Sequence, residues 1–267
     1  NIGVSGCSGK MGKTLIKLIS NRRDCNITSG LEAEKNPDIG KDLGNLIGSE
    51  NINAAVESDR KAFFENCDII IDFSTPQSTL ENIKFAKKYR KGLVIGTTGL
   101  SQEIEKAIET ATKNVPIVYS ANMSIGINIL LELTNKLSNI LSEEDFDIEI
   151  LEMHHKHKVD APSGTALALG NAAANGREIE LKKHSEIVRN GINTKRTIGN
   201  IGFASLRGGS VTGDHSVLFA SDHEIIELKH KADNRSLFAA GAIKAAIWLS
   251  DKENGLYSMK DVLNLKI

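Results

Sequence analysis

The chain has 267 residues, of which 40% are hydrophobic, so it can form one large domain or two smaller ones with buried cores. Its formal net charge of −1 at pH 7 does not indicate a nucleic-acid partner, and no apolar run is long enough to span a membrane. The three cysteines, Cys7, Cys25 and Cys67, form no metal-binding spacing and no disulfide framework, and no signal peptide is recognisable, so we expect a cytoplasmic protein without a membrane partner.

The first predicted elements are a strand, a glycine-rich turn and a helix. The apolar segment 2–5 runs into Gly6-Cys7-Ser8-Gly9-Lys10-Met11-Gly12, and apolar residues then recur at helical spacing. The spacing G-x-x-G-x-x-G is a variant of the dinucleotide-binding fingerprint, in which missing side chains let the backbone approach a pyrophosphate at a helix N-terminus. Taken alone, these glycines are equally compatible with a plain tight turn.

A second predicted strand, residues 27–31, ends at Glu32. An acidic residue about 20 positions beyond the glycines is placed to accept hydrogen bonds from the adenosine ribose, although an ordinary surface charge is the alternative. The next residue is Ala33, so no arginine stands there to bind a 2′-phosphate, and Lys35 is only a weak substitute. We therefore predict NADH or NADPH as the cofactor, with a preference for NADH.

The βα pattern continues along the first half of the chain. Strands are predicted at 68–73, 93–95 and 116–119, with helices at 77–90, 101–113 and 125–141, whereas 36–66 is polar and shows little periodicity. This alternation predicts a Rossmann-like doubly wound parallel sheet. In such sheets ligands bind at the carboxyl ends of the strands, so the turns at 6–12, 73–75, 96–99 and 120–123 are expected to meet around one crevice.

The second half has a different pattern, which predicts an α+β domain with a mixed or antiparallel sheet. Residues 147–153 alternate as in a strand, residues 165–174 are helical, and residues 175–198 are polar and loop-like. Three strands follow at 201–207, 210–220 and 224–232, and Gly208-Gly209 predicts a hairpin between the first two. A helix at 235–249 and a capping box at Ser258–Asp261 then suggest a return to the first domain.

Residues 154–165 concentrate the chemistry of this second half. Three histidines and two lysines occupy five positions, and the fixed charge of Lys156 and Lys158 among the histidines argues against a metal site. Ser163, Gly164 and Thr165 enter a helix, whose first N–H groups and adjacent hydroxyls are suited to an anion. If the preceding strand continues through this point, His154 and His155 face opposite sides of it.

A solvated basic loop is the simplest reading of this stretch, but it does not explain an anion site beside histidines. A histidine at such a site can deliver a proton near neutral pH. Next to a nicotinamide cofactor, this combination predicts the reduction of an acidic small molecule, with the proton supplied by the protein.

The segment Glu152-Met153-His154-His155-Lys156-His157-Lys158-Val159-Asp160-Ala161-Pro162-Ser163-Gly164-Thr165-Ala166 resembles the signature of the dihydrodipicolinate reductase family, also called 4-hydroxy-tetrahydrodipicolinate reductases, of bacterial diaminopimelate and lysine synthesis. The resemblance extends to the turns at 6–12, 96–99 and 120–123 and to residues 198–203 and 246–249. It implies NAD(P)H-dependent reduction of 4-hydroxy-tetrahydrodipicolinate, a cyclic dicarboxylate, to tetrahydrodipicolinate. It also implies a homotetramer that assembles through the sheet of the second domain.

The resemblance implies a role for each matching residue. His154 is the expected general acid, and Lys158 is expected to neutralise a substrate carboxylate and to share in proton delivery. His155 is expected to contact the substrate, and Ser163, Gly164 and Thr165 to hold its distal carboxylate. The expected cofactor contacts are Gly6, Gly9, Lys10, Met11, Gly12, Glu32, Phe73, Gly96, Thr97, Thr98, Ser120, Ala121, Asn122 and Met123.

These assignments predict a dinucleotide-binding domain, residues 1–124 and 235–267, and a substrate-binding and oligomerisation domain, residues 125–234. Two other functions were considered, namely a different amino-acid-pathway dehydrogenase and a non-catalytic dinucleotide-binding sensor. Residues 154–165 argue against both, because a sensor needs no histidine and lysine together. A semialdehyde dehydrogenase would need a cysteine nucleophile, and all three cysteines lie in the dinucleotide-binding half.

Overall fold

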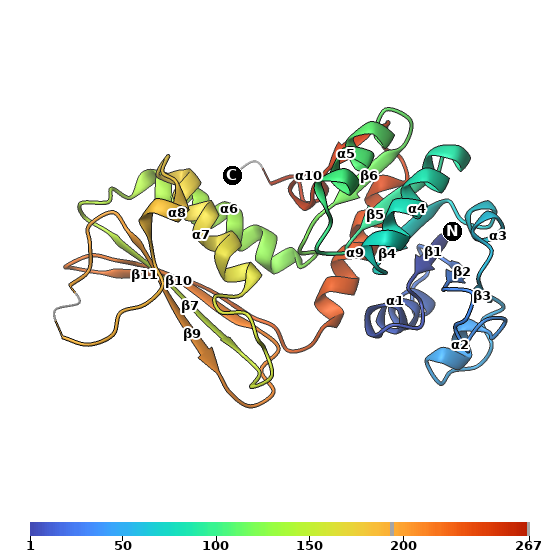
Figure 1. Cartoon of the computed structure of the whole chain (residues 1–267), viewed down its shortest axis with the longest axis horizontal. Coiled ribbons are helices and arrows are strands. Elements are labelled where there is room, and N and C mark those ends of the chain that lie inside the picture. Colours follow the sequence, from blue (N-terminus) through green and yellow to red (C-terminus); the bar gives the residue numbers. More distant parts are fainter. Residues whose placement is uncertain (193–194, 266–267) are drawn as a thin grey trace. The chain divides into compact units, whose positions relative to one another are not determined.

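The computed structural model describes residues 1–192 and 195–265, and Figure 1 labels their helices and strands where there is room. Contacts divide them into two compact units. The first unit consists of Asn1–Ile125 and Arg235–Asn264, and the second unit of Gly126–Asn234 and Leu265. Asn193, Thr194, Lys266 and Ile267, which belong to the predicted loop at 175–198 and to the predicted end of the dinucleotide-binding domain, lie outside the described residues.

The first unit contains a seven-stranded sheet in the order β12-β6-β5-β4-β1-β2-β3, with every neighbouring pair parallel. Its strands are β1 (Ile2–Ser5), β2 (Ile27–Leu31), β3 (Val56–Glu57), β4 (Ile69–Asp72), β5 (Gly92–Ile95), β6 (Pro116–Tyr119) and β12 (Gly255–Tyr257). The order reverses at β1 and β4, which are neighbours although β2 and β3 intervene in the chain. The predicted Rossmann-like sheet is therefore confirmed.

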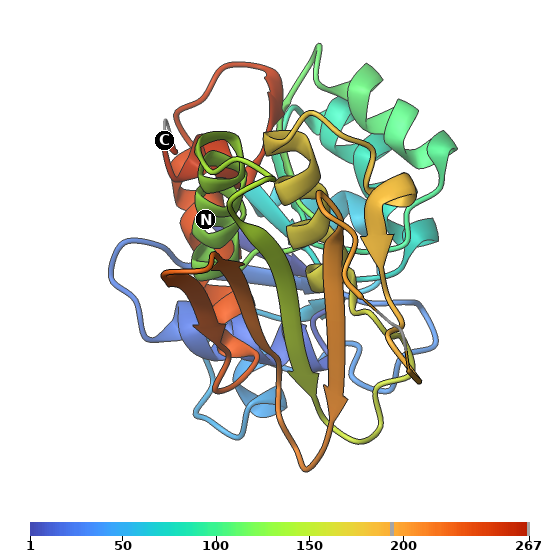
Figure 2. The ribbon, with the colours of Figure 1, turned by 90° about the vertical axis from the view of Figure 1, so that its left-hand side faces the viewer.

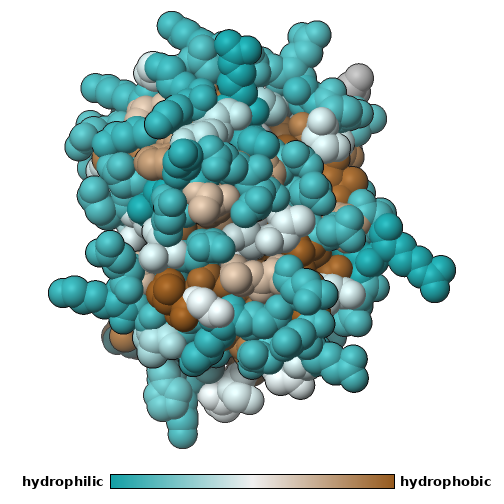
Figure 3. Space-filling view, turned by 90° about the vertical axis from the view of Figure 1, so that its right-hand side faces the viewer, coloured by the Kyte–Doolittle hydropathy of each residue, from teal (hydrophilic) through white to brown (hydrophobic). Residues whose placement is uncertain are grey.

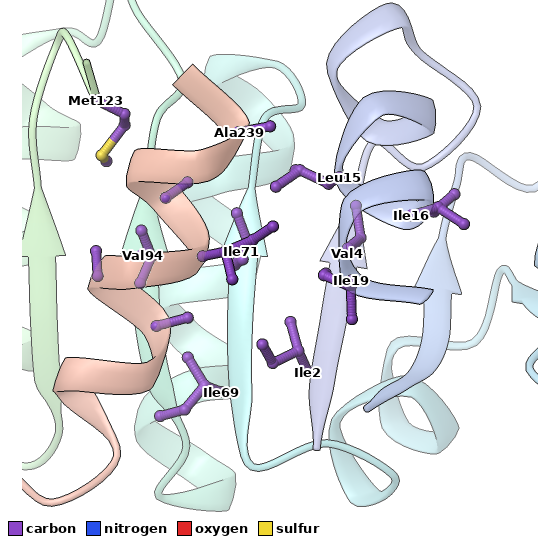
Figure 4. Packing of buried hydrophobic residues seen from close by; sticks show 14 of the residues in the cluster. Ile2, Val4, Leu15, Ile16, Ile19, Ile69, Ile71, Val94, Met123 and Ala239 are labelled. Atoms are coloured by element: carbon purple, nitrogen blue, oxygen red, sulfur yellow. The ribbon is translucent and has the colours of Figure 1, made fainter. Parts of the chain in front are cut away.

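Helices cover both faces of this sheet because the side chains of its buried strands alternate. Ile69 and Ile71 pack in one apolar cluster, with α1 (Lys10–Ser20), α9 (Ser236–Leu249) and α10 (Met259–Val262). Ile70 lies in the other cluster, with α3 (Arg60–Glu65), α4 (Pro76–Tyr89) and α5 (Gln102–Ala111). Figure 4 shows the side chains of the first cluster between the strands and helices α1 and α9.

Four elements of the first unit were not predicted from the sequence. The polar region 36–66 contains α2 (Leu43–Leu46), β3 and α3. These elements are short and rely on local caps, such as the carboxylate of Asp42, which accepts from the Gly44 N–H at 2.7 Å. Near the C-terminal end of the chain, β12 pairs with β6 at the sheet edge. The predicted capping box after it is confirmed, because Ser258 N–H donates to Asp261 Oδ2 at 2.7 Å.

The side of the first unit that carries α1, α2 and α3 is mainly hydrophilic. In Figure 3, which shows the side of the molecule where α1, α2 and α3 lie, hydrophobic residues are scattered in small patches among polar ones. None of the described helices is both long enough and apolar enough to cross a membrane.

The second unit contains a five-stranded mixed sheet in the order β11-β10-β7-β9-β8 (Figure 2). Its strands are β7 (Asp147–His154), β8 (Ser185–Glu186), β9 (Ile201–Arg207), β10 (Asp214–Ala220) and β11 (Ile225–Lys231). The central strand β7 is antiparallel to β10 and parallel to β9. Both the second domain type and the mixed sheet agree with the prediction.

The predicted hairpin at Gly208-Gly209 is wrong, because β7 lies between β9 and β10. The connecting loop instead crosses the end of β7, where Gly208 N–H donates to His154 O at 2.9 Å and Lys156 N–H donates to Gly209 O at 3.3 Å. The two glycines therefore lie in a loop that passes over β7 and not in a tight turn. The local sequence pattern could not predict this, because β7 comes from an earlier part of the chain.

One face of this sheet is covered by α6 (Ile125–Ile140) and α7 (Gly164–Gly176), whose apolar residues pack on Ile148, Ile150 and Val217. The predicted loop at 175–198 is partly wrong, since it contains α8 (Leu181–His184) and β8. The other face carries exposed apolar side chains, including Leu151, Leu206 and Ile225.

Candidate active site

The glycine-rich loop of the first unit connects β1 to α1 and is shaped by close backbone contacts. Gly6 has a φ of +80°, and a Cβ there would lie 2.5 Å from Phe73 O. A Cβ at Gly12 would lie 2.2 Å from Gly6 O. Both positions therefore require glycine, the first for its left-handed backbone and the second for close packing of the helix on the loop.

The first turn of α1 is suited to bind a phosphate. Its N-cap, Gly9, offers no side-chain hydrogen bond, and the first intrahelical bond runs from Lys13 N–H to Gly9 O at 2.9 Å. The backbone N–H groups of Lys10, Met11 and Gly12 therefore have no acceptor within the helix. Together with the positive end of the helix dipole, they fit the pyrophosphate of a dinucleotide.

Glu32 lies at the end of β2, beside the glycine-rich loop. Its Oε1 accepts the backbone N–H of Ser8 at 2.8 Å, and its own N–H donates to Glu57 O at 2.9 Å. The carboxylate is thus held against the loop that would bind the pyrophosphate, with Oε2 as the oxygen not used by Ser8. This is the position that an adenosine ribose would require.

A buried polar cluster underlies the turns after β1, β4 and β5, and sequence reasoning missed it. Asp72 is fully buried, and its carboxylate accepts hydrogen bonds from Ser74 Oγ at 2.5 Å, Asn82 Nδ2 at 2.9 Å and Thr97 Oγ1 at 3.3 Å. Asn82 also donates to Ser5 Oγ at 2.9 Å. Burial raises the pKa of Asp72, although hydrogen bonds from Ser74 and Asn82 oppose this. The sequence feature that could have indicated this cluster is Asp72 itself, a carboxylate directly after the apolar residues 69–71.

The predicted contacts after β4 and β5 therefore lie together. A Cβ at Gly96 would lie 2.3 Å from the Phe73 ring, so glycine leaves room for this ring. Thr98 is exposed beside the buried Thr97. The structure brings the turn after β6 to the same edge through Ser120, whose N–H donates to Ile95 O at 3.3 Å.

Within the turn after β6, Ala121 is exposed, and Ser120 Oγ donates to Asn122 O at 2.8 Å. Met123 packs its side chain in the core of the first unit. Any contact of Met123 with a cofactor would therefore have to use its backbone.

In the second unit, β7 ends at His154, so the strand alternation predicted for His154 and His155 stops between them. His154 is buried, and its Nδ1 contacts Oε2 of Glu152, which is 1% exposed. Both residues lie on the face of β7 that also buries Ile148 and Ile150. The sequence analysis assigned no role to Glu152, although a carboxylate on the apolar face of a strand was a visible signal.

The carboxylate of Glu152 is held from several sides. Arg207, at the end of β9, donates to Oε2 at 3.0 Å and to Oε1 at 2.9 Å, and Ser163 N–H donates to Oε1 at 3.3 Å. Burial by itself raises the pKa of Glu152, but hydrogen bonds from Arg207, Ser205 and His154 outweigh it and lower this pKa below its usual value. Glu152 is therefore an anion despite its depth.

His215, on the neighbouring strand β10, completes this cluster. Its ring packs edge-on against that of His154, with centroids 5.1 Å apart, and its Nε2 lies 3.2 Å from Ser163 Oγ. Burial, followed by the nearby charge of His154, lowers the pKa of His215 to about 4. His215 is therefore neutral at physiological pH. It lies on a different strand from the histidine-rich stretch, and the sequence analysis did not find it.

The predicted anion site lies at the start of α7. The Ser163 hydroxyl caps this helix by accepting from Ala166 N–H at 3.2 Å, so its predicted contact with a substrate stays a prediction. Lys158 forms an ion pair with Asp160, with Nζ 2.8 Å from Oδ1. This ion pair and the backbone N–H of Gly164 lower the pKa of Asp160. The carboxylate of Asp160 thus contacts both the Lys158 ammonium group and the first residue of α7.

The remaining histidines of the stretch lie in the turn after β7. His155 is half-buried, His157 is exposed, and their ring centroids are 6.3 Å apart. Within the described residues no group of three or more histidine, cysteine or acidic side chains is arranged to hold a metal ion. The arrangement can therefore offer a buried carboxylate–imidazole pair, a lysine and a helix N-terminus, a set suited to an acidic substrate that receives a proton.

Comparison with known proteins identifies the family. A model described as "Dihydrodipicolinate reductase, N-terminus" matches residues 1–123, and one described as "Dihydrodipicolinate reductase, C-terminus" matches residues 126–263. The chain belongs to the dihydrodipicolinate reductase family. Members of this family are NAD(P)H-dependent oxidoreductases of diaminopimelate and lysine synthesis, so the predicted enzyme class and pathway are confirmed.

Relatives in this reductase family match the chain over nearly its full length. The 4-hydroxy-tetrahydrodipicolinate reductase of Bartonella bacilliformis is 49% identical over 264 residues, which cover 98% of each chain. That of Brucella melitensis is 48% identical over 262 residues, again 98% of each chain. The dipicolinate-bound dihydrodipicolinate reductase of Paenisporosarcina sp. TG-14 has the same fold, with a TM-score of 0.77 at 22% identity over 99% of this chain and 98% of that one.

Proposed function

We propose that this chain reduces 4-hydroxy-tetrahydrodipicolinate to tetrahydrodipicolinate, with His154 as the proton donor. The observation that carries this proposal is the buried Glu152–His154 pair next to the start of α7, within a chain of the reductase family. The nicotinamide cofactor supplies the hydride. The chain's own residues bind and orient the substrate and deliver the proton to it.

The substrate is a cyclic dicarboxylate, and the second unit offers two kinds of group to bind it. The Lys158 ammonium group gives up its ion pair with Asp160 and binds one substrate carboxylate instead, whose charge it neutralises. The backbone N–H groups at the start of α7, from Gly164 and Thr165, bind the distal carboxylate once Gly164 has released Asp160, since the helix dipole favours negative charge there. His155 contacts the substrate from the turn after β7. We accordingly propose the second unit as the substrate-binding domain.

The first unit is proposed as the dinucleotide-binding domain, with the N-terminus of α1 on the pyrophosphate and Glu32 on the adenosine ribose. The turns 73–74, 96–98 and 120–123 bind the nicotinamide side. A preference for NADH over NADPH is supported by the carboxylate of Glu32 and by Ala33, since a 2′-phosphate would meet an anion where an arginine would be needed.

A homotetramer is proposed as the assembled form. The uncovered face of the second unit's sheet carries Leu151, Leu206 and Ile225, which are 37%, 48% and 63% exposed. Exposed apolar side chains gathered on one sheet face favour association with another protein surface. The three free cysteines are consistent with a reducing, cytoplasmic location.

The activity is tested by following NADH oxidation in the presence of the product formed from pyruvate and aspartate semialdehyde. His154→Gln and Lys158→Ala are each expected to lower kcat by about 10²–10⁴-fold, the range of general acid catalysis. Lys156→Ala, which removes an exposed lysine from the same turn, is the matched control. Wild-type turnover in both His154→Gln and Lys158→Ala would contradict the proposed mechanism.

The cofactor preference is tested separately by comparing kcat/KM for NADH and NADPH in the wild-type enzyme. We expect a higher value for NADH. A strong preference for NADPH would refute the inference from Ala33 while leaving the proposed reaction intact.

A further inference from the structure

We propose that Glu152 is a positioning residue for the reduction, whose carboxylate holds the Nδ1–H of His154 so that Nε2 is the nitrogen that releases the proton. This inference deepens the proposed function and rests on His154 as the proton donor. The geometry involves only residues of the second unit.

The protonation of the two ring nitrogens follows from the partner of each. An ionised carboxylate is only an acceptor, so Nδ1 carries a proton in the neutral ring as well as in the imidazolium. The other nitrogen lies beside Gly213, where a Cβ would be 2.9 Å from Nε2. The absence of a side chain at Gly213 therefore leaves space at the nitrogen that must exchange its proton.

The carboxylate can position the ring because it is itself immobilised. Arg207 binds both of its oxygens, and the same guanidinium donates to Asp160 O at 2.5 Å. Ser163, the cap of α7, donates its N–H to Oε1. Glu152 thus connects the proton donor on β7 with the two segments that carry the proposed carboxylate-binding groups.

The charged and titratable groups around His154 agree with this role. Glu152 lies on its own strand, Arg207 on β9, and His215 packs against it from β10. Arg207 is paired with Glu152, and His215 is neutral because burial lowers its pKa to about 4. Among these three groups, Glu152 is therefore the one that accepts a hydrogen bond from the His154 ring, on the Nδ1 side.

The proton step balances without any further reactant. The N–H bond at Nε2 of the imidazolium breaks as a new bond to hydrogen forms on the substrate, and the ring is left neutral with its remaining proton on Nδ1, bonded to Glu152. The two electrons of the reduction are those of the hydride. The 4-hydroxyl group of the substrate leaves as water, which accounts for the oxygen that tetrahydrodipicolinate lacks. Water then returns a proton to Nε2.

Glu152→Gln tests the proposal because its amide has a predictable orientation. The single amide oxygen is expected to replace Oε1, because an NH2 group there would face two donors, Arg207 and Ser163 N–H. At the position of Oε2 the NH2 group faces only one fixed donor, the other N–H group of Arg207, since the His154 ring can change its tautomer. The NH2 group then replaces Oε2 and faces Nδ1, which can only accept from it as the Nε2–H tautomer. A ring held in that tautomer has no proton on Nδ1 to retain when Nε2 releases its own.

We expect Glu152→Gln to lower kcat by about 10²-fold, while KM for NADH changes by less than about two-fold. The ¹⁵N shifts of the His154 ring, assigned by comparison with His154→Gln, should change from the Nδ1–H pattern in the wild type to the Nε2–H pattern. Glu149→Gln is the matched control, since Glu149 lies on the same strand and is bound by Arg189 and Arg196. It should keep both the native tautomer and kcat.

Wild-type kcat in folded Glu152→Gln, or an unchanged ¹⁵N pattern, would overturn the proposal. If this variant does not fold, the wild-type spectrum decides, because a neutral His154 with its proton on Nε2 would equally overturn it. The tautomer is measured without substrate. An enzyme inactive on the proposed substrate but with the Nδ1–H tautomer would therefore refute the proposed function and leave the geometric inference standing.

Discussion

Two carboxylates that are hardly exposed to solvent, Asp72 at the end of β4 and Glu152 near the end of β7, have opposite pKa shifts. Asp72 is 0% and Glu152 1% exposed. In the part of the chain that the structure describes, Asp72 is bound by the uncharged groups of Ser74, Asn82 and Thr97, and burial raises its pKa. Glu152 is bound by Arg207, and its pKa is lowered. A charged partner such as Arg207 can therefore keep a buried carboxyl an anion, whereas burial among neutral partners raises its pKa.

This difference corresponds to two different tasks. The Asp72 cluster ties together the turns after three parallel strands, for which neutral hydrogen bonds suffice. The Glu152 cluster holds an imidazole that must carry a positive charge during the proposed reaction, for which a fixed anion is required. Each of the following changes should therefore affect one cluster and leave the other intact.

The largest effect is expected from Arg207→Met, which leaves Glu152 buried without its cation. Breaking a buried ion pair from one side typically costs about 3–5 kcal/mol. Urea-induced unfolding should show a loss of stability in this range. Arg189→Met is the control, because the pair between Arg189 and Glu149 is more exposed and should contribute less than about 1 kcal/mol. Equal losses in the two variants would show that Glu152 is not held as an anion by Arg207.

The next effect concerns pH and His215. The pKa of His215 is lowered from 6.5 to about 4, so below pH 6.5 the unfolded chain binds a proton that the folded chain does not. Stability is thus fully present above pH 6.5 and is lost as the pH falls towards 4, by about 3 kcal/mol from this group at 1.36 kcal/mol per unit.

The measurement is urea-induced unfolding of the wild type and of His215→Asn across this range of pH. The variant should lack this part of the pH dependence. Parallel curves for the two proteins would show that His215 is not the group responsible.

The smallest effect is expected from Asp72→Asn, which replaces the carboxyl by a neutral group of similar shape. The hydroxyls of Ser74 and Thr97 can rotate to accept from the new NH2, so the cost should be about 1–2 kcal/mol. Because the pKa of Asp72 is raised, the unfolded chain releases its proton first as the pH rises above 3.8, and wild-type stability falls. The stability difference between wild type and Asp72→Asn should therefore shrink with rising pH, and a widening difference would contradict the raised pKa.

The local features of the fold could be predicted because they depend on residues close in sequence. The glycine-rich loop, the βα alternation and the capping box at Ser258 were visible in short windows. The short elements between 36 and 66 were not, because two- to six-residue segments show no clear periodicity. The hairpin at Gly208-Gly209 was predicted wrongly because the sequence around it contains no record that β7 lies between the two strands.

The candidate site divides in the same way. The sequence by itself determined which chemical groups are present: an anion-binding helix start, a histidine-rich stretch after a strand, and the alternation that puts Glu152 and His154 on one face of β7. Only the tertiary structure decided their partners, because Arg207 and His215 reach this cluster through the order of strands in the sheet. The charge of a buried group depends on these distant neighbours, so the contrast between Asp72 and Glu152 could not be inferred from their positions in the sequence alone.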